Sequence, residues 1–181
     1  MIPIETERLR LRAFESRDAV RLARYRSEPT VAVYQSWSEM TLSEAEQLIA
    51  TPYDPTRLDR WSQIAVADRE TDELIGDIGI CVRSPGDVAE LGVTFAPDGQ
   101  GKGLAAEACR AAIELLFSLS SVTRIEAIVD ARNYAAIALM RRLGMRLDRT
   151  EEAVFKGEVC SEHHFVLPRF EYFERAIRVL A

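Results

Sequence analysis

Cysteine is scarce in this chain: Cys81, Cys109 and Cys160 are the three among 181 residues, and they lie far apart in the sequence. An odd number at these spacings fits neither a disulfide framework nor the paired ligands of a zinc site. We therefore expect no bound metal. Unpaired cysteines are typical of reducing compartments, so the expected location is the cytoplasm.

Long apolar runs and an excess of basic residues are also absent. No stretch is apolar over the roughly 20 residues that a membrane-spanning helix needs. The start, Ile2-Pro3-Ile4-Glu5 followed by basic residues, lacks the pattern of a secretory signal peptide. The formal net charge is −6 and no basic cluster occurs. We therefore expect neither a membrane nor a nucleic acid as a partner.

The composition that remains is that of a globular protein. Hydrophobic residues make up 48% of the sequence and charged residues 29%. A length of 181 residues can bury a sizeable core, and it fits one domain spanning residues 1–181. No internal repeat, linker or low-complexity segment divides the chain.

A glycine-rich segment, residues 95–107, lies between a strand-like run and a helical pattern that begins at Leu104. The start of a helix has unpaired N–H groups and a partial positive charge, so it attracts anions. Gly101 and Gly103 let the backbone approach such an anion closely, and Lys102 adds a full charge. The segment therefore predicts a phosphate cradle. The alternative is a glycine-rich turn without a ligand.

Two phosphate-binding patterns can be compared with this cradle. The P-loop pattern fails, because Gly103 follows Lys102 where Ser or Thr is required. The dinucleotide fingerprint G-x-G-x-x-A is matched by residues 101–106, and Asp130 could supply its acidic residue at the end of the next strand. A nicotinamide dinucleotide enzyme is therefore one alternative.

Periodicity and turn residues predict an α+β fold with a mixed, mostly antiparallel central sheet flanked by helices, one of them C-terminal. Helices are expected after the capping residues Ser16 or Asp18, from the capping box at Thr41 to Glu44, and after Asn133. Two further helices follow Gly103 and Pro168. Strands are expected over residues 8–13, 61–67, 74–82, 88–95, 124–130, 145–155 and 158–167.

Several motifs in this order resemble the GNAT acyl-CoA N-acyltransferases. The cradle contains Gln100-x-x-Gly103-x-Ala105, which resembles the family signature Q/R-x-x-G-x-G/A. Residues 6–12, Thr-Glu-Arg-Leu-Arg-Leu-Arg, are similar to the opening of its ribosomal-protein N-terminal (alanine) acetyltransferase branch. Asn133 with Leu143-Gly144-Met145, and the hairpin turn at residues 155–158, also resemble that branch. The resemblance covers nearly the whole chain and implies the GNAT fold.

The resemblance also implies a co-substrate and a site. Acetyl-CoA would bind where the strands at 89–95 and 124–130 splay apart, and a primary amine would attack it directly. The amine acceptor would be a protein N-terminal α-amine or a small amine. The implied cofactor-binding residues are Val93, Thr94, Phe95, Gln100, Gly101, Lys102, Gly103, Leu104, Ala105 and Asn133.

Catalytic residues are less clearly marked. Glu90 shares a strand face with Thr94, so it is a candidate general base, and Asp77 is a weaker one. The helix positions that carry a Ser or Tyr proton donor in relatives hold Ala136 and Met140, which have no proton to donate. Either water protonates the CoA thiolate, or the chain is a catalytically silent acyl-CoA-binding module.

Other candidates have equally ordinary explanations. Tyr34 and Trp37 could form the substrate pocket or be core aromatics. His163 and His164 point to opposite faces of a strand, so they cannot share a metal. Arginines 141 and 142 could reach CoA phosphates or be solvated. The last helix has an apolar stripe that could serve a homodimer or the chain's own core, formed by Phe170, Phe173, Ile177 and Leu180.

Overall fold

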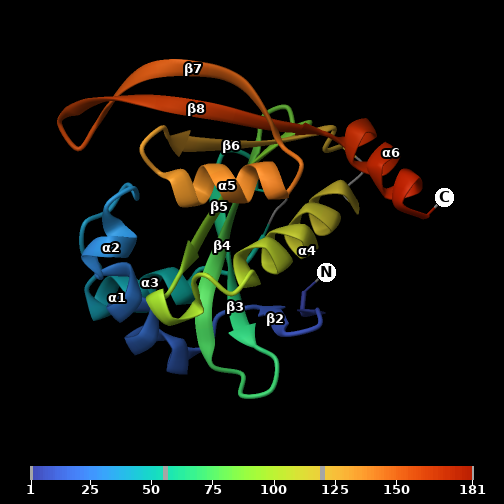
Figure 1. The fold of residues 1–181 in the computed structure, drawn as a ribbon. Helices are drawn as coiled ribbons and strands as arrows, with labels where there is room; N and C mark the ends of the chain where they lie inside the picture. The colour runs from blue at the N-terminus through green and yellow to red at the C-terminus, as the bar shows by residue number, and fades with distance from the viewer. Residues whose placement is uncertain (1, 55–56, 119–120, 181) are drawn as a thin grey trace.

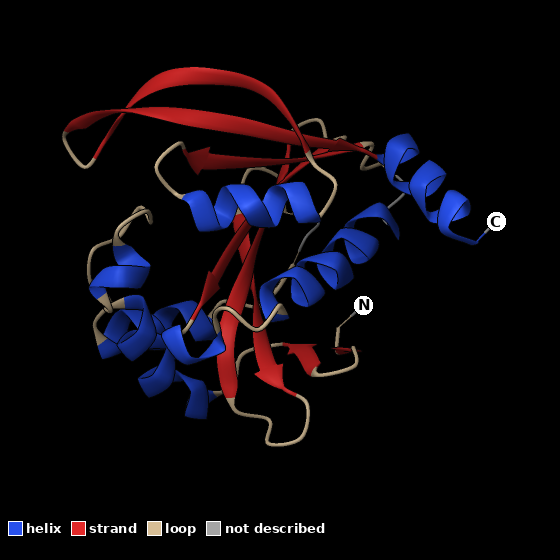
Figure 2. Cartoon of the chain, viewed as in Figure 1, coloured by secondary structure: helices blue, strands red, loops and turns tan. Residues whose placement is uncertain are grey.

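A single twisted sheet runs through the molecule (Figures 1 and 2). The computed structural model describes residues 2–54, 57–118 and 121–180, and in the last helix the side chains up to Glu174. Within these residues the sheet has eight strands in the order β1-β2-β3-β4-β5-β6-β8-β7. The strands are β1 (Ile4–Glu5), β2 (Leu9–Arg12), β3 (Trp61–Asp68), β4 (Leu74–Arg83), β5 (Val88–Phe95), β6 (Arg124–Asp130), β7 (Arg146–Phe155) and β8 (Glu158–Pro168).

Every neighbouring pair of strands is antiparallel except β5 and β6. These two run parallel and pair only from Val88 with Arg124 to Glu90 with Glu126. The expected mixed, mostly antiparallel sheet is therefore confirmed. A doubly wound parallel sheet, which the dinucleotide fingerprint would require, is not what the chain forms.

The helices lie on both faces of this sheet. They are α1 (Ala19–Arg26), α2 (Pro29–Ala32), α3 (Leu42–Ala50), α4 (Leu104–Ser118), α5 (Tyr134–Arg142) and α6 (Arg169–Leu180). Alternating residues of β3 show the arrangement. Ile64 and Val66 belong to the main core with α4 and α5, whereas Ala65 between them belongs to a smaller cluster with α1 and α3. In Figure 1, α4 and α5 lie in front of the strands and α1 to α3 lie to one side.

The capping residues explain why two of the helices begin where they do. Thr41 and Glu44 form the expected capping box, in which the Glu44 N–H donates to Thr41 Oγ1 at 3.2 Å. Asn133 caps α5 by accepting the Ala136 N–H at 3.1 Å. Asp18, in contrast, does not cap α1 through its side chain. Its carboxylate instead accepts from the buried guanidinium of Arg12 at 2.7 Å.

Three details differ from the sequence predictions. Strand β1 and the four-residue helix α2 were not predicted, because elements this short carry little periodicity. Pro168 ends β8, and α6 begins one residue later at Arg169. In the predicted apolar stripe of α6, Phe170 and Phe173 are exposed, while the side chains of residues 177 and 180 lie outside the described part of the chain.

Candidate functional site

The segment between β5 and α4 has the conformation expected of a cradle. A short 3-10 turn at Pro97–Gly99 leads into it, and the Gln100 side chain closes it by donating from Nε2 to the Phe95 carbonyl at 2.9 Å. Gly101 and Gly103 have φ angles of +73° and +77°, which residues with a side chain rarely adopt. The glycines are therefore required by the backbone of the turn as well as by any ligand.

The amide groups at the start of α4 are available to an anion. The first intrahelical bond runs from the Glu107 N–H to the Gly103 carbonyl at 3.2 Å, so the preceding N–H groups, those of Leu104 to Ala106, have no helical acceptor. A Cβ built on Gly103 would meet only Arg8 Nη2, at 3.8 Å, and one built on Gly101 would meet nothing within 4 Å. The space that these side chains would fill fits a phosphate held against the backbone.

Arg8 and Glu107 fix the backbone of the cradle through hydrogen bonds. Glu107 accepts from Thr6 Oγ1 at 2.6 Å and from Arg8 Nε at 2.8 Å, and Arg8 Nη1 donates to the Lys102 carbonyl at 3.0 Å. Partial burial by itself would raise the pKa of Glu107, but the hydrogen bonds from Thr6 and Arg8 outweigh it, so the pKa lies below its ordinary value. These hydrogen bonds between residues 99 or more positions apart were not predicted from the sequence.

A cavity of about 450 Å³ opens onto the cradle. It is lined by residues of α2 and the segment after it, by the end of β5, by the cradle and by α5: Thr30, Val31, Tyr34, Gln35, Val93, Thr94, Phe95, Gly99, Gln100, Gly101, Gly103, Leu104, Ala105, Ala106, Asn133, Ala135, Ala136, Ala138, Leu139 and Arg142. Of the predicted cofactor-binding residues, Lys102 is absent from this lining. Its side chain is exposed. Thr30, Val31 and Gln35 were not foreseen, because no motif marks them.

The cavity lies where β5 and β6 separate. Their ladder ends at Glu90 and Glu126, so the rest of β5, which includes Val93, Thr94 and Phe95, has an edge not paired with β6. A free strand edge can pair with an extended ligand through backbone hydrogen bonds. Beside it, β4 and β5 approach each other closely at Gly76, because a Cβ built there would lie 2.6 Å from the Thr94 carbonyl oxygen.

The two candidate bases have different surroundings. Glu90 is outside the lining of this cavity, and its carboxylate forms an ion pair with Arg83, the last residue of the neighbouring strand β4. Asp77 is buried and binds both Arg26 and the Tyr25 hydroxyl. Burial and the Asp77 charge raise the pKa of Tyr25 well above its ordinary value. Asp77 therefore has a structural role in joining α1 to the sheet.

Ala136 lines the cavity and Met140 is buried with 2% exposure, so neither position offers a proton. Tyr34 also lines the cavity, and its hydroxyl donates to the Arg132 carbonyl at 3.2 Å. Trp37 lies outside the lining. The Arg26 guanidinium carbon lies over its indole, 4.3 Å from the ring centroid, and its Nε1 donates to the Arg26 carbonyl at 3.1 Å.

The histidines have partners on β7 rather than in the cavity. His163 Nδ1 is 2.8 Å from Thr150 Oγ1, and His164 Nε2 is 3.3 Å from a Glu151 carboxylate oxygen. Within the described residues no group of three His, Cys, Asp or Glu side chains is placed to hold a metal ion. No helix in the described part of the chain is long and apolar enough to cross a membrane.

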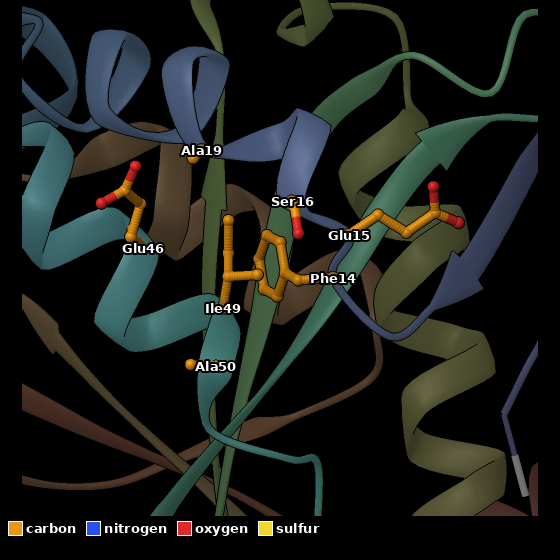
Figure 3. Close-up of a pocket in the computed structure, with 7 residues that line it drawn as sticks. All are labelled: Phe14, Glu15, Ser16, Ala19, Glu46, Ile49 and Ala50. Carbon is orange, nitrogen blue, oxygen red and sulfur yellow. The ribbon is translucent and has the colours of Figure 1, made fainter.

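A second hollow, of about 610 Å³, lies between α3 and the segment that leads into α1 (Figure 3). Phe14 and Ile49 both line it and both pack against the smaller core cluster, and Glu46 lies to one side in this view. Glu15, also in the lining, forms an ion pair with Arg17. None of the cradle residues lines this hollow, so it belongs to a different part of the molecule.

Comparison with known proteins decides the family. The family model described as the acetyltransferase (GNAT) domain matches residues 8–146. The chain belongs to the GNAT family. An uncharacterized N-acetyltransferase, p20 of Bacillus licheniformis, is 32% identical over 177 residues, which cover 95% of this chain and 99% of that protein. As a GNAT member the chain is an acyl-CoA-dependent acetyltransferase, and the family uses acetyl-CoA as co-substrate.

Solved structures of GNAT proteins share the fold. A candidate ribosomal-protein-serine acetyltransferase from Vibrio cholerae is 28% identical, has a TM-score of 0.74, and is matched over 93% of this chain and 99% of that one. The spermidine N-acetyltransferase of Vibrio cholerae, solved with CoA and spermine, is 21% identical with a TM-score of 0.77, over 93% and 99% of the two chains. Family membership favours acetyl-CoA over a nicotinamide dinucleotide as the co-substrate.

Proposed function

We propose that this GNAT protein transfers an acetyl group from acetyl-CoA to a primary amine, and that the cavity beside the cradle is its acyl-CoA site. The observation that carries the proposal is that three features of an acyl-CoA site border the same cavity. A free strand edge at Val93 to Phe95, unpaired amides at Leu104 to Ala106 and the open space at Gly103 all border one cavity.

Each part of the cavity has a task in this proposal. The amides at the start of α4 bind the pyrophosphate, and the edge of β5 pairs with the pantetheine amides. That edge directs the thioester toward the splay between β5 and β6. A backbone N–H of residues 93–95 stabilises the oxyanion of the tetrahedral intermediate, which one such donor can do by roughly 3 kcal/mol.

Proton transfer depends on Glu90 and on the solvent. Glu90 is the last residue of β5 that pairs with β6, and it lies on the same strand face as Thr94; in the proposal it removes the amine proton through water. The CoA thiolate is a fair leaving group, because a free thiol has a pKa of about 8.5, so water protonates it where Ala136 and Met140 cannot.

The proposed acceptor is a protein N-terminal α-amine or a small amine. An α-amine has a pKa of about 7.7–8.0, so it is partly neutral near pH 7.5 and needs only modest help from a base. This favours the α-amine, as does the ribosomal-protein acetyltransferase among the structural neighbours, whereas the spermidine acetyltransferase favours a small polyamine.

Two measurements test the proposal in order. Acetyl-CoA and CoA should raise the melting temperature, with a stabilisation of about 2.7 kcal/mol at 100 times the dissociation constant, and NADH should not. Release of free thiol from acetyl-CoA is then measured with a panel of N-terminal peptides, polyamines and amino acids. Binding without turnover of any amine would support a silent acyl-CoA-binding module. A shift with NADH and none with CoA would refute the site itself.

A further inference from the structure

Lys156, at the tip of the β7–β8 hairpin, reaches across to the α2 region. Its Nζ donates to the Ala32 carbonyl at 2.8 Å and to the Trp37 carbonyl at 2.9 Å. In Figure 1 the hairpin tip lies above α2. Ala32 is the last residue of α2, and the two carbonyls bracket residues 33–37, here called the wall segment. One ammonium thus holds both ends of the wall segment.

The wall segment carries Tyr34, which lines two cavities at once. One is the proposed acyl-CoA cavity of about 450 Å³. The other, of about 510 Å³, lies between the hairpin and α2 and is also bordered by Lys156, Phe155 and Glu158. Tyr34 is therefore a wall that the two cavities share.

The backbone of the wall segment has few bonds of its own to fix it. Val33 N–H donates to the Pro29 carbonyl at 3.1 Å and Gln35 N–H to the Ala32 carbonyl at 3.0 Å, both near its beginning. At its end, Trp37 is stacked on Arg26, which is buried against Asp77. Arg26 therefore anchors the wall segment to the sheet, the Tyr34 hydroxyl anchors its middle to the Arg132 carbonyl at 3.2 Å, and Lys156 anchors both of its ends to the hairpin.

The chemistry of the lysine suits this position. An ammonium has three donors around one nitrogen, so it can serve two carbonyls that converge on a point, whereas a planar guanidinium spreads its donors. Lysine occurs at only two positions in this arginine-rich chain, 102 and 156. The backbone at Lys156 has a φ of +51°, which places the side chain at a tight turn with its ammonium 5.5 Å from the Phe155 ring.

We propose that Lys156 is a positioning residue for the acceptor. By fixing the wall segment it holds Tyr34 between the acyl-CoA cavity and the hairpin cavity, so that the amine enters at a defined place. This rests on the proposed function, in which the first cavity holds acetyl-CoA. Loss of the ammonium frees the wall segment and weakens acceptor binding, while the cradle on the other side of the cavity is unchanged.

The test compares Lys156→Met and Lys156→Arg with Val154→Thr, a matched control on the same hairpin whose side chain is 74% exposed. Amide hydrogen exchange is followed by mass spectrometry on peptides that span residues 30–40. Lys156→Met should speed exchange there about tenfold, because local opening becomes easier when two hydrogen bonds are lost. The exchange rate of Lys156→Arg should lie between those of Lys156→Met and the wild type, and the control should exchange at the wild-type rate.

Activity supplies the second readout. With an amine that is turned over, Lys156→Met should raise the KM for the amine about fivefold or more and leave the calorimetric Kd for CoA within twofold. Unchanged exchange in residues 30–40 of a folded Lys156→Met protein would overturn the inference. A rise in the Kd for CoA as large as the rise in the KM for the amine would also overturn it. If neither the wild type nor any variant binds CoA, the proposed function is wrong. The exchange data then still show whether Lys156 fixes the wall segment.

Discussion

Arg8 Nη2 and Glu107 Oε2 lie 2.7 Å apart, although 99 positions separate the two residues in the sequence. Arg8 precedes β2 and Glu107 is in the first turn of α4. Because the same guanidinium also donates to the Lys102 carbonyl, the pair ties the N-terminal strands to the backbone of the cradle. The motif that resembles the family opening, residues 6–12, thereby acquires a physical role.

Glu107→Gln should weaken both the fold and CoA binding. The amide keeps the volume but gives up the charge that Arg8 and Thr6 bind, so we expect a loss of about 1 kcal/mol in unfolding free energy. CoA affinity should fall about fivefold because the cradle is held less firmly. Denaturant unfolding and calorimetry measure the two effects. Asp148→Asn, which breaks exposed ion pairs with Arg146 and Arg149, is the control and should change neither.

Acid should destabilise the protein through the same carboxylate. The pKa of Glu107 lies below its ordinary value of 4.5, and a hydrogen bond from Arg21 lowers the pKa of Asp98 below 3.8. Depressed carboxyl pKa values stabilise the fold above the ordinary values, and this stability is lost as pH falls through the folded ones. The unfolding free energy, measured from pH 7 to 3, should decline below about pH 4.5. A double variant, Glu107→Gln with Asp98→Asn, should show a shallower decline; an identical slope would contradict the assignment.

Gly103→Val should abolish CoA binding in a folded protein. The backbone there has a φ of +77°, and the new side chain would enter the space assigned to the pyrophosphate. Gly157→Val is a matched control, because it has a φ of +82°, an equally open surrounding and a place on the hairpin far from the cradle. Both variants should lose similar stability, but only Gly103→Val should lose CoA affinity by calorimetry. Equal CoA affinity in the two would mean that the glycine serves the turn alone.

Arg142 and Arg141 make a second matched pair. Arg142 lines the cavity and Arg141 does not, although they are adjacent on α5. Arg142→Gln should reduce CoA affinity about 5- to 30-fold through loss of a charge-assisted contact with a phosphate, and Arg141→Gln should have little effect. The loss should shrink at high salt because screening weakens the wild-type contact. Parallel losses in both variants would point to a diffuse charge effect.

Glu90→Gln should lower turnover roughly 10- to 1000-fold while acetyl-CoA affinity stays the same, because a general base acts on the amine and not on CoA. Turnover against pH is measured for both proteins with an amine found in the panel. Glu126→Gln is the control, since Glu126 pairs with Glu90 across the strands and has its own arginine, Arg124. Full turnover with an unchanged pH profile in Glu90→Gln would make Glu90 structural, a partner of Arg83 only.

Local signals were sufficient for much of the architecture. The capping box at Thr41 and Glu44, the cap at Asn133 and the alternation of the strands depend on neighbours within a few residues, and the structure confirms them. The cradle glycines were recognisable for the same reason, because a backbone position with positive φ is usually occupied by glycine. Strand β1 and helix α2 are too short to show a periodic pattern of apolar residues.

The amino-acid sequence by itself indicated the family through its motifs, and the mixed sheet and the glycine turn before α4 through periodicity and turn residues. Only the tertiary structure decided which side chains meet. It paired Glu90 with Arg83, placed Trp37 on Arg26, left Lys102 out of the cavity lining and brought Lys156 to the carbonyls of Ala32 and Trp37. Such contacts join residues up to 124 positions apart. They depend on strand register and on how the β7–β8 hairpin curves over α2, which no local pattern encodes.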